Sequence, residues 1–122
     1  MKSTIFPLDV VGGVFGYLQP MVCYKNDKEV IHRTFQEFKE DPLFEEFSWK
    51  DDGRYPYSEL LESSITSLHV ASLLTWVDLR YIMIRYKQQE RIAEGIHNKF
   101  SPLEKEVLKF IAHLLHERLE KE

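Results

Sequence analysis

The sequence contains very little cysteine, since Cys23 is the one cysteine among its 122 residues. A single cysteine cannot form a disulfide bond within the chain, which excludes the disulfide frameworks of many small secreted proteins. It fits a reducing compartment, and we expect a cytoplasmic protein. The N-terminal residues agree with this expectation, because Pro7 and Asp9 interrupt the apolar run that a signal peptide would need.

Long hydrophobic runs and an excess of basic charge are also missing. Residues 63–77 carry no Lys, Arg, Asp or Glu, but this stretch is shorter than the roughly 20 residues that a membrane-spanning helix requires. Acidic residues outnumber Lys and Arg by 20 to 16, giving a net charge of -4 and a pI near 5.7. Nucleic-acid-binding proteins normally carry a basic surface. We therefore expect neither a membrane protein nor a nucleic-acid partner.

Recognisable catalytic motifs are absent as well. The chain has neither the Gly-x-x-x-x-Gly-Lys pattern of phosphate-binding loops nor the Gly-x-Gly-x-x-Gly pattern of dinucleotide-binding folds; Gly12, Gly13 and Gly16 fit neither. The chain has no His-Glu-x-x-His zinc motif and no Gly-x-Ser-x-Gly nucleophile elbow. From the sequence we predict no catalytic residues, no cofactor, no bound metal and a function that is not enzymatic.

Apolar residues are plentiful, and their spacing predicts helices. With 43% hydrophobic and 30% charged residues, the chain has enough apolar material for a core. Leu61, Ile65 and Leu68 recur at helical spacing after Ser58, and further apolar residues continue on most faces as far as Tyr86. This pattern predicts one long buried helix over about residues 58–92.

Capping signals mark the other predicted helices. Ser101, Pro102 and Glu104 form a capping box at the start of a C-terminal helix over about residues 102–120. Asn26 begins a similar pattern, and Asp41 can cap a short helix after it. A short connection then predicts that the long helix and the C-terminal helix pack antiparallel.

Together these segments predict an all-α fold, a single domain over residues 1–122 with four to five helices in a bundle around the long helix. The first 25 residues are less clear, because Pro7 and the apolar spacing favour a helix whereas three glycines disfavour one. The alternative is a small α+β fold with an N-terminal β-hairpin.

The most unusual composition lies between Glu37 and Tyr57, where aromatic and acidic residues are crowded together. Aromatic side chains beside charge, on a loop, are typical of protein interfaces. The same aromatics could instead close the core. As a hypothesis, we assign partner binding to Phe44, Glu45, Glu46, Trp49, Asp51, Asp52, Arg54 and Tyr55. This assignment predicts a protein-binding module, such as an inhibitor or an immunity-type protein, that binds a basic partner protein.

Two alternative functions follow from other side chains. Arg80, Arg85, Lys87 and Arg91 form a basic cluster that could bind nucleic acid. His113, His116 and Glu117 have spacings that share a helix face, and with Asp78 or His69 they could serve a small metal-dependent enzyme. Neither set completes a known motif, because a zinc site needs a further ligand that the spacing does not supply.

Overall fold

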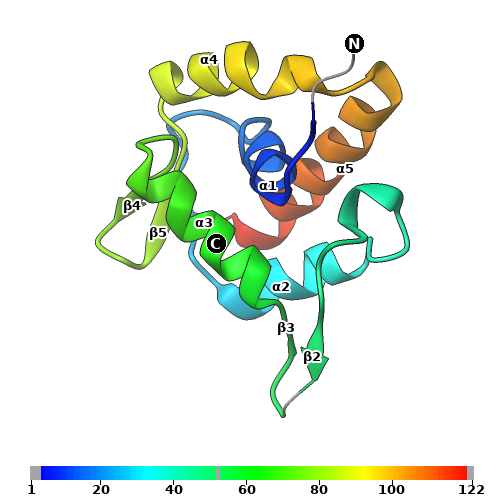
Figure 1. Ribbon diagram of the computed structural model, residues 1–122. Helices are drawn as coiled ribbons and strands as arrows, with labels where there is room; N and C mark the ends of the chain where they lie inside the picture. The colour runs from blue at the N-terminus through cyan, green and yellow to red at the C-terminus, as the bar shows by residue number, and fades with distance from the viewer. Residues whose placement is uncertain (1–3, 52, 121–122) are drawn as a thin grey trace.

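Helix α1 lies at the centre of the structure, with the other helices packed around it (Figure 1). The computed structural model describes residues 4–51 and 53–120. The helices are α1 (Pro7–Phe15), α2 (Lys28–Gln36), α3 (Glu59–Val70), α4 (Tyr86–Gly95) and α5 (Pro102–Leu119), with 3-10 helices η1 (Pro42–Phe44) and η2 (His97–Lys99). The strands are β1 (Tyr24–Lys25), β2 (Lys50–Asp51), β3 (Pro56–Tyr57), β4 (Thr75–Val77) and β5 (Tyr81–Met83).

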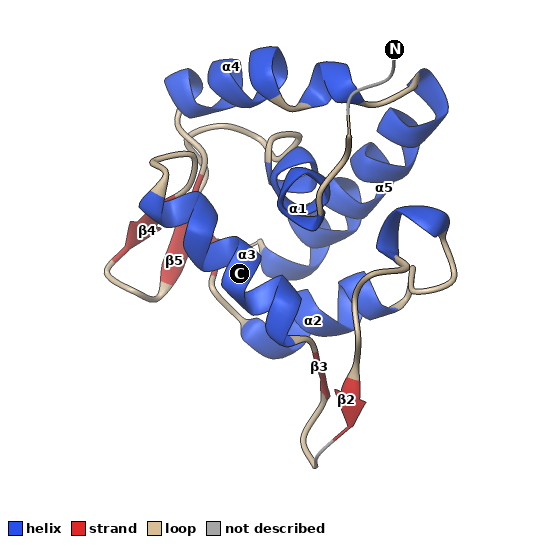
Figure 2. Ribbon diagram, viewed as in Figure 1, coloured by secondary structure: helices blue, strands red, loops and turns tan. Residues whose placement is uncertain are grey.

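The strands form two small antiparallel sheets at different places on the helical body (Figure 2). One sheet has the strand order β1-β5-β4. Strand β5 pairs on one side with β4, its partner in a hairpin, and on the other side with β1, from the N-terminal third of the chain. The second sheet is the hairpin formed by β2 and β3. The fold is therefore mixed α+β, and the all-α prediction was wrong.

The predicted long helix over 58–92 is two helices separated by a β-hairpin. Helix α3 ends at Val70, and Ser72 then takes a left-handed backbone with φ of 63°. The hairpin turn contains Asp78 and Leu79, both with positive φ, and Arg80 N–H donates to the Val77 carbonyl across it. β-Branched and aromatic residues favour strands on both sides of this turn. The α+β class of the alternative prediction is confirmed, but its N-terminal β-hairpin was wrong. Residues 7–15 form α1, and the hairpins among the described residues are β2–β3 and β4–β5.

The predicted antiparallel pairing of the last two helices was also wrong. Helix α5 packs mainly against α1 and α2. The Tyr24 hydroxyl lies 2.6 Å from His116 Nδ1, which ties β1 to α5. Near the end of α5, Arg118 donates to a carboxylate oxygen of Glu37 at 2.7 Å, and so holds the end of α2. These contacts connect segments more than 80 positions apart, beyond what local spacing can indicate.

Several predicted helix starts are confirmed. Ser58 accepts the Leu61 N–H at the start of α3, and Ser101 with Glu104 forms the capping box of α5. Asp41 caps η1, and Pro7 lies in the first turn of α1. The α2 cap is Asp27 rather than Asn26, because the Asp27 carboxylate accepts the Val30 N–H. Side-chain caps of this kind satisfy the free N–H groups of a first helical turn.

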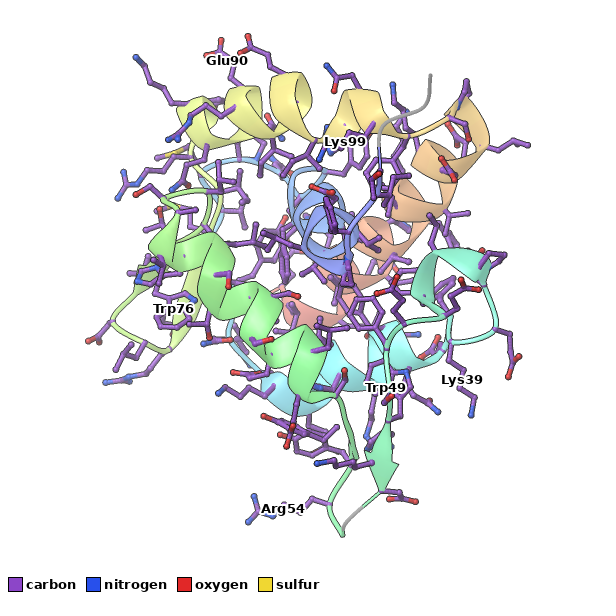
Figure 3. The ribbon with its side chains drawn as sticks, viewed as in Figure 1. Lys39, Trp49, Arg54, Trp76, Glu90 and Lys99 are labelled. Carbon is purple, nitrogen blue, oxygen red and sulfur yellow. The ribbon has the colours of Figure 1, made fainter. Side chains whose placement is uncertain are left out.

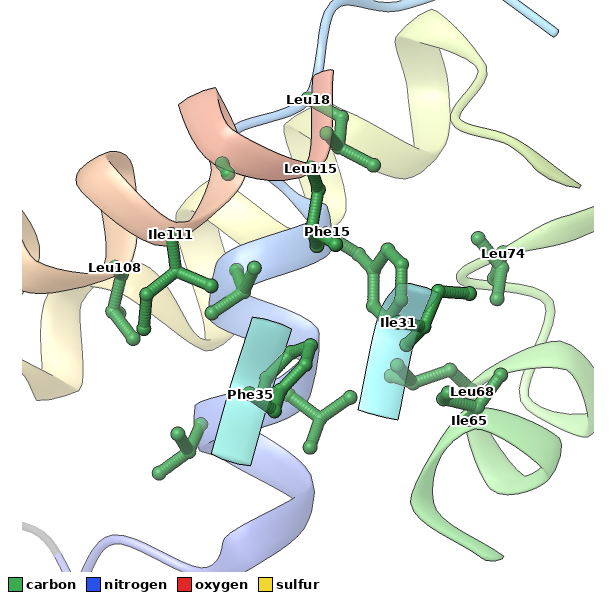
Figure 4. Packing of buried hydrophobic residues seen from close by; sticks show 14 of the residues in the cluster. Phe15, Leu18, Ile31, Phe35, Ile65, Leu68, Leu74, Leu108, Ile111 and Leu115 are labelled. Carbon is green, nitrogen blue, oxygen red and sulfur yellow. The ribbon is translucent and has the colours of Figure 1, made fainter. Parts of the chain in front are cut away.

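The core is built on both sides of α1. Phe15 packs against Phe35 of α2, with ring centroids 6.3 Å apart, and both side chains are fully buried (Figure 4). Leucine and isoleucine side chains of α3 and α5 complete this cluster, as Figure 4 shows; they include Ile65, Leu68, Leu108, Ile111 and Leu115. Glycines in α1 and directly after it let neighbouring elements approach closely: a Cβ at Gly16, the C-cap of α1, would lie 2.5 Å from Ile92 Cγ2.

Candidate functional site

The predicted partner-binding segment folds into a region with both core and surface residues. Phe44 is fully buried and packs against Phe35 and Phe47, so its side chain belongs to the core. Trp49 is half-buried beside α2 (Figure 3), with its ring 6.2 Å from that of His32. Tyr55 also packs on His32, at 5.8 Å. The aromatics of this segment therefore face mainly inward.

The charged residues of the same segment face outward. Glu45 and Glu46 are exposed after η1, and Asp51 is exposed on β2. Arg54 extends from the far end of the β2–β3 hairpin, and its carbonyl accepts a hydrogen bond from Arg33. Asp52, the remaining predicted residue, lies outside the residues that the structure describes. The seven predicted residues that the structure describes thus do not form one continuous site.

Glu45 and Glu46 rim a small groove between η1 and the start of α1. We call it the acidic groove; its volume is about 130 Å³, and it is lined by Ile5, Phe6, Pro7, Val10, Pro42, Leu43, Glu45 and Glu46. Neither glutamate forms an ion pair or a side-chain hydrogen bond within residues 4–51 and 53–120. The groove therefore places two free carboxylates beside apolar side chains of α1 and η1.

A buried polar network joins α2 to α3. His32 is fully buried; its Nδ1 accepts the Ser58 N–H at 3.1 Å, so the proton of the neutral ring is on Nε2, which donates to Glu62 at 3.2 Å. The other oxygen of Glu62 pairs with Lys28 at 2.7 Å. The hydrogen bond from His32 lowers the pKa of Glu62 to about 2, against the cost of burial and with further help from Lys28.

Aromatic rings enclose the imidazole of this network. Tyr57 stacks on His32 at 4.7 Å with an interplanar angle of 9°, and Trp49 meets the ring edge-on. Because both ring nitrogens are bonded and the ring is covered, His32 cannot accept a proton from a substrate without breaking the network. Glu62, with its low pKa, is ionised at neutral pH and cannot serve as a general acid there. This arrangement favours structural or binding roles.

A pocket opens beside this network where α2, α3 and the β4–β5 hairpin meet. We call it the hairpin pocket; its volume is about 230 Å³, and it is lined by Asn26, Lys28, Ile31, His32, Glu62, Ile65, Trp76 and Leu79. Trp76 stacks on His69 of α3 at 4.1 Å, which fixes the hairpin against the helix (Figure 3). None of the residues that line this pocket was among the predicted partner-binding residues. No spacing rule links Lys28 and His32 to Glu62, 30 positions further along the chain than His32.

The residues proposed for metal binding are occupied by other contacts. His113 pairs with Glu117 at 3.2 Å. His116 contacts the Tyr24 hydroxyl through Nδ1 and the Glu120 carboxylate through Nε2. Asp78 lies exposed in the hairpin turn, 3.8 Å from Arg80. Among the residues that the structure describes, no group of three or more His, Cys, Asp or Glu side chains is placed to hold a metal ion.

The proposed basic cluster is divided by the hairpin. Arg80 is at the tip and Arg85 is just before α4, at the other end of β5, about 16 Å away for five extended residues. Lys87 and Arg91 are exposed on α4. Arg85 donates to Thr75 on the neighbouring strand. Arg80 and Arg85 therefore lie on separate parts of the surface, and the four basic residues do not form one cluster.

The fold and these two cavities define a small mixed α+β protein with candidate binding sites. No helix among the described residues is long and apolar enough to cross a membrane. Comparisons with protein-family models, with curated proteins and with solved structures give no match.

Proposed function

We propose that this protein is a non-enzymatic binding protein that recognises a basic segment of a partner protein through the acidic groove. The observation that carries the proposal is the pair of free carboxylates at Glu45 and Glu46 beside the apolar side chains that share the groove with them. A lysine or arginine side chain has the matching chemistry, since its aliphatic stem can cover Leu43 and Phe6 while its charged head meets the two glutamates.

The surrounding charge supports the same partner. Glu40 and Asp51 are exposed and, like Glu45 and Glu46, have no ion pair within the described part of the chain. Glu37 is neutralised by Arg118, and Asp41 caps η1. The remaining negative field steers a basic partner toward this face and accelerates the encounter.

The test is a charge-reversal pair with a matched control. The double variant Glu45→Lys and Glu46→Lys should weaken binding to arginine- and lysine-rich peptides at least tenfold, measured by fluorescence anisotropy at low salt. Glu90→Lys with Glu94→Lys makes the same change in net charge on the exposed face of α4 and should retain binding. Equal losses in both double variants, or no binding by the wild-type protein, would contradict the proposal.

A second candidate function is nucleic-acid binding, and the sheet topology favours it. The chain order is α1-β1-α2-η1-β2-β3-α3-β4-β5. Apart from the inserted η1 and β2–β3 hairpin, this order, with β5 between β1 and β4, resembles that of winged helix-turn-helix domains. In helix-turn-helix domains the second helix of the motif, here α3, enters the major groove. A shared topology does not establish a shared function, which depends on the site.

The charges on this face weigh against that candidate. The exposed residues of α3 include Glu59, Ser63 and Thr66 but no Lys or Arg, and Arg80 of the hairpin is next to Asp78. Phosphate contacts need free cations, and their number sets the salt dependence of binding. A mobility-shift assay at low salt decides the matter: we expect no shift, and salt-sensitive binding that is lost in Arg80→Ala would establish this second function instead.

A further inference from the structure

The hairpin pocket has a polar end with unused bonding capacity. Lys28 and Glu62 form an ion pair there, at 2.7 Å. A lysine ammonium has three N–H donors, and a carboxylate can accept about four hydrogen bonds. Each therefore retains capacity for a further partner after the contacts to each other and to His32 are made.

Much of the remaining lining is apolar, although the buried indole N–H of Trp76 has no hydrogen-bond partner among the described residues. Ile65 lies one turn after Glu62 on α3, and Trp76 and Leu79 come from the hairpin. Leu79 has φ of 59°, and the residue is 74% exposed. A left-handed backbone is unfavourable for leucine, and turns of this kind normally use glycine or asparagine. An apolar side chain is thus held at the pocket in a strained backbone, a feature that often accompanies binding sites.

The size of the pocket limits its ligand. A volume of about 230 Å³ is below the roughly 300–1,000 Å³ of sites for drug-sized molecules. It corresponds to about eight times the roughly 30 Å³ that one water molecule occupies in the liquid. The ligand should therefore be a small molecule of about the size of one amino acid.

The charge pattern limits the ligand further. Glu62 would repel a simple anion, and Lys28 would repel a simple cation. A purely apolar molecule would leave the polar end without a partner. A molecule with a positive group, a negative group and a short apolar group can pair with Glu62, pair with Lys28 and cover the apolar side chains of the pocket.

We propose that the hairpin pocket binds a free apolar α-amino acid as a zwitterion. Its ammonium group pairs with Glu62, its carboxylate pairs with Lys28, and its side chain lies against Ile65, Trp76 and Leu79. This site is separate from the acidic groove, since the two share no lining residue. The proposal does not depend on the protein partner proposed above.

Tryptophan fluorescence provides a direct test, because Trp76 lines the pocket. In a Trp49→Phe background, Trp76 is the one remaining tryptophan. Titration with leucine, methionine and phenylalanine should give a saturable change for at least one of them. N-acetyl-leucine, which lacks the ammonium group, and leucinamide, which lacks the carboxylate, should bind at least tenfold more weakly than leucine if leucine is the ligand. If methionine or phenylalanine is the ligand, its own N-acetyl and amide derivatives are tested in the same way.

A matched pair of lysine variants identifies the site. Lys28→Met should weaken binding at least tenfold, whereas Lys25→Met, at an exposed position on β1 outside the pocket, should leave it unchanged. If the Trp49→Phe protein does not fold, calorimetric titration of the otherwise wild-type protein with the same lysine variants replaces the fluorescence.

Three results would overturn the proposal. The first is the absence of saturable binding by any of the three amino acids at millimolar concentration. The second is equal binding of the blocked derivatives, which would show that the two charges are not recognised. The third is equal weakening by Lys25→Met and Lys28→Met, which would place the ligand elsewhere.

Discussion

Replacing Gly16 by alanine should destabilise the protein by about 3 kcal/mol and lower Tm by about 10 °C. The added Cβ would lie 2.5 Å from Ile92 Cγ2 and 3.0 Å from atoms of the His97 ring. Ile92 is fully buried. The His97 ring is held by a 2.9 Å hydrogen bond to the Gly13 carbonyl and by stacking on Tyr17 at 3.8 Å. Neither neighbour can move without losing its own contacts, so α1 itself must shift.

Gly95→Ala is the matched control for this variant. A Cβ at Gly95 meets no atom within 4 Å, and the residue is exposed at the end of α4. Alanine has a higher helix propensity than glycine, so this variant should be unchanged or more stable by up to about 1 kcal/mol. Thermal and urea unfolding, followed by circular dichroism, measure both. A Gly16→Ala protein as stable as the wild type would show that α1 does not pack against α4 and η2 as described.

The glycines of α1 also show what composition alone cannot predict. As a local signal, three glycines count against a helix. In the structure, a Cβ at each of these three positions would lie within 3.1 Å of a side chain from a neighbouring segment. Tertiary packing overrides the unfavourable propensity, and the helix forms because its apolar faces are buried on nearly all sides.

The missed β-hairpin has a different cause. Residues 73–84 are apolar at many positions, and a short apolar run fits a buried helix and a strand equally well. Hairpins are usually recognised by Asn-Gly or Asp-Gly turns, whereas this one turns at Asp78-Leu79. The signal that could have identified it is the β-branched and aromatic content of Thr75–Val77 and Tyr81–Met83.

The predicted site was limited in the same way. Local composition correctly indicated exposed acids at Glu45, Glu46 and Asp51, because charged residues on a loop are seldom buried. It could not separate Phe44, which is in the core, from residues at the surface. Lys28, His32 and Glu62 were missed because they come together only when α2 packs beside α3, and nothing in their separation along the chain predicts this.

The contacts of Glu62 with His32, and secondarily with Lys28, should make stability depend on pH in the acid range. The pKa of Glu62 is about 2 in the folded protein and near 4.5 when unperturbed. Because the folded pKa is the lower one, the folded state holds the proton less tightly than the unfolded state. The stabilisation is therefore complete above about pH 4.5 and is lost as the pH falls toward 2. Lys28 is 54% exposed, so solvent screening reduces the contribution to about 1–2 kcal/mol.

Glu62→Gln should remove this contribution while keeping an acceptor for His32. At pH 7 the free energy of unfolding should fall by about 1–2 kcal/mol, and the difference from the wild type should disappear as the pH approaches 2. Glu59→Gln, one turn earlier on α3, is the control. Its carboxylate is 72% exposed and pairs with Lys50 at the surface, so its effect should stay within about 0.5 kcal/mol.

Urea unfolding of the three proteins at a series of pH values measures the difference directly. Burial also lowers the pKa of His97, so acid weakens the wild type through that ring too, with the loss setting in as the pH falls below the ordinary histidine range. That effect is common to all three proteins and cancels in the comparison. If Glu62→Gln lost the same free energy at pH 2 as at pH 7, the role of Glu62 would be packing or hydrogen bonding, and its charge would contribute nothing to joining α2 and α3.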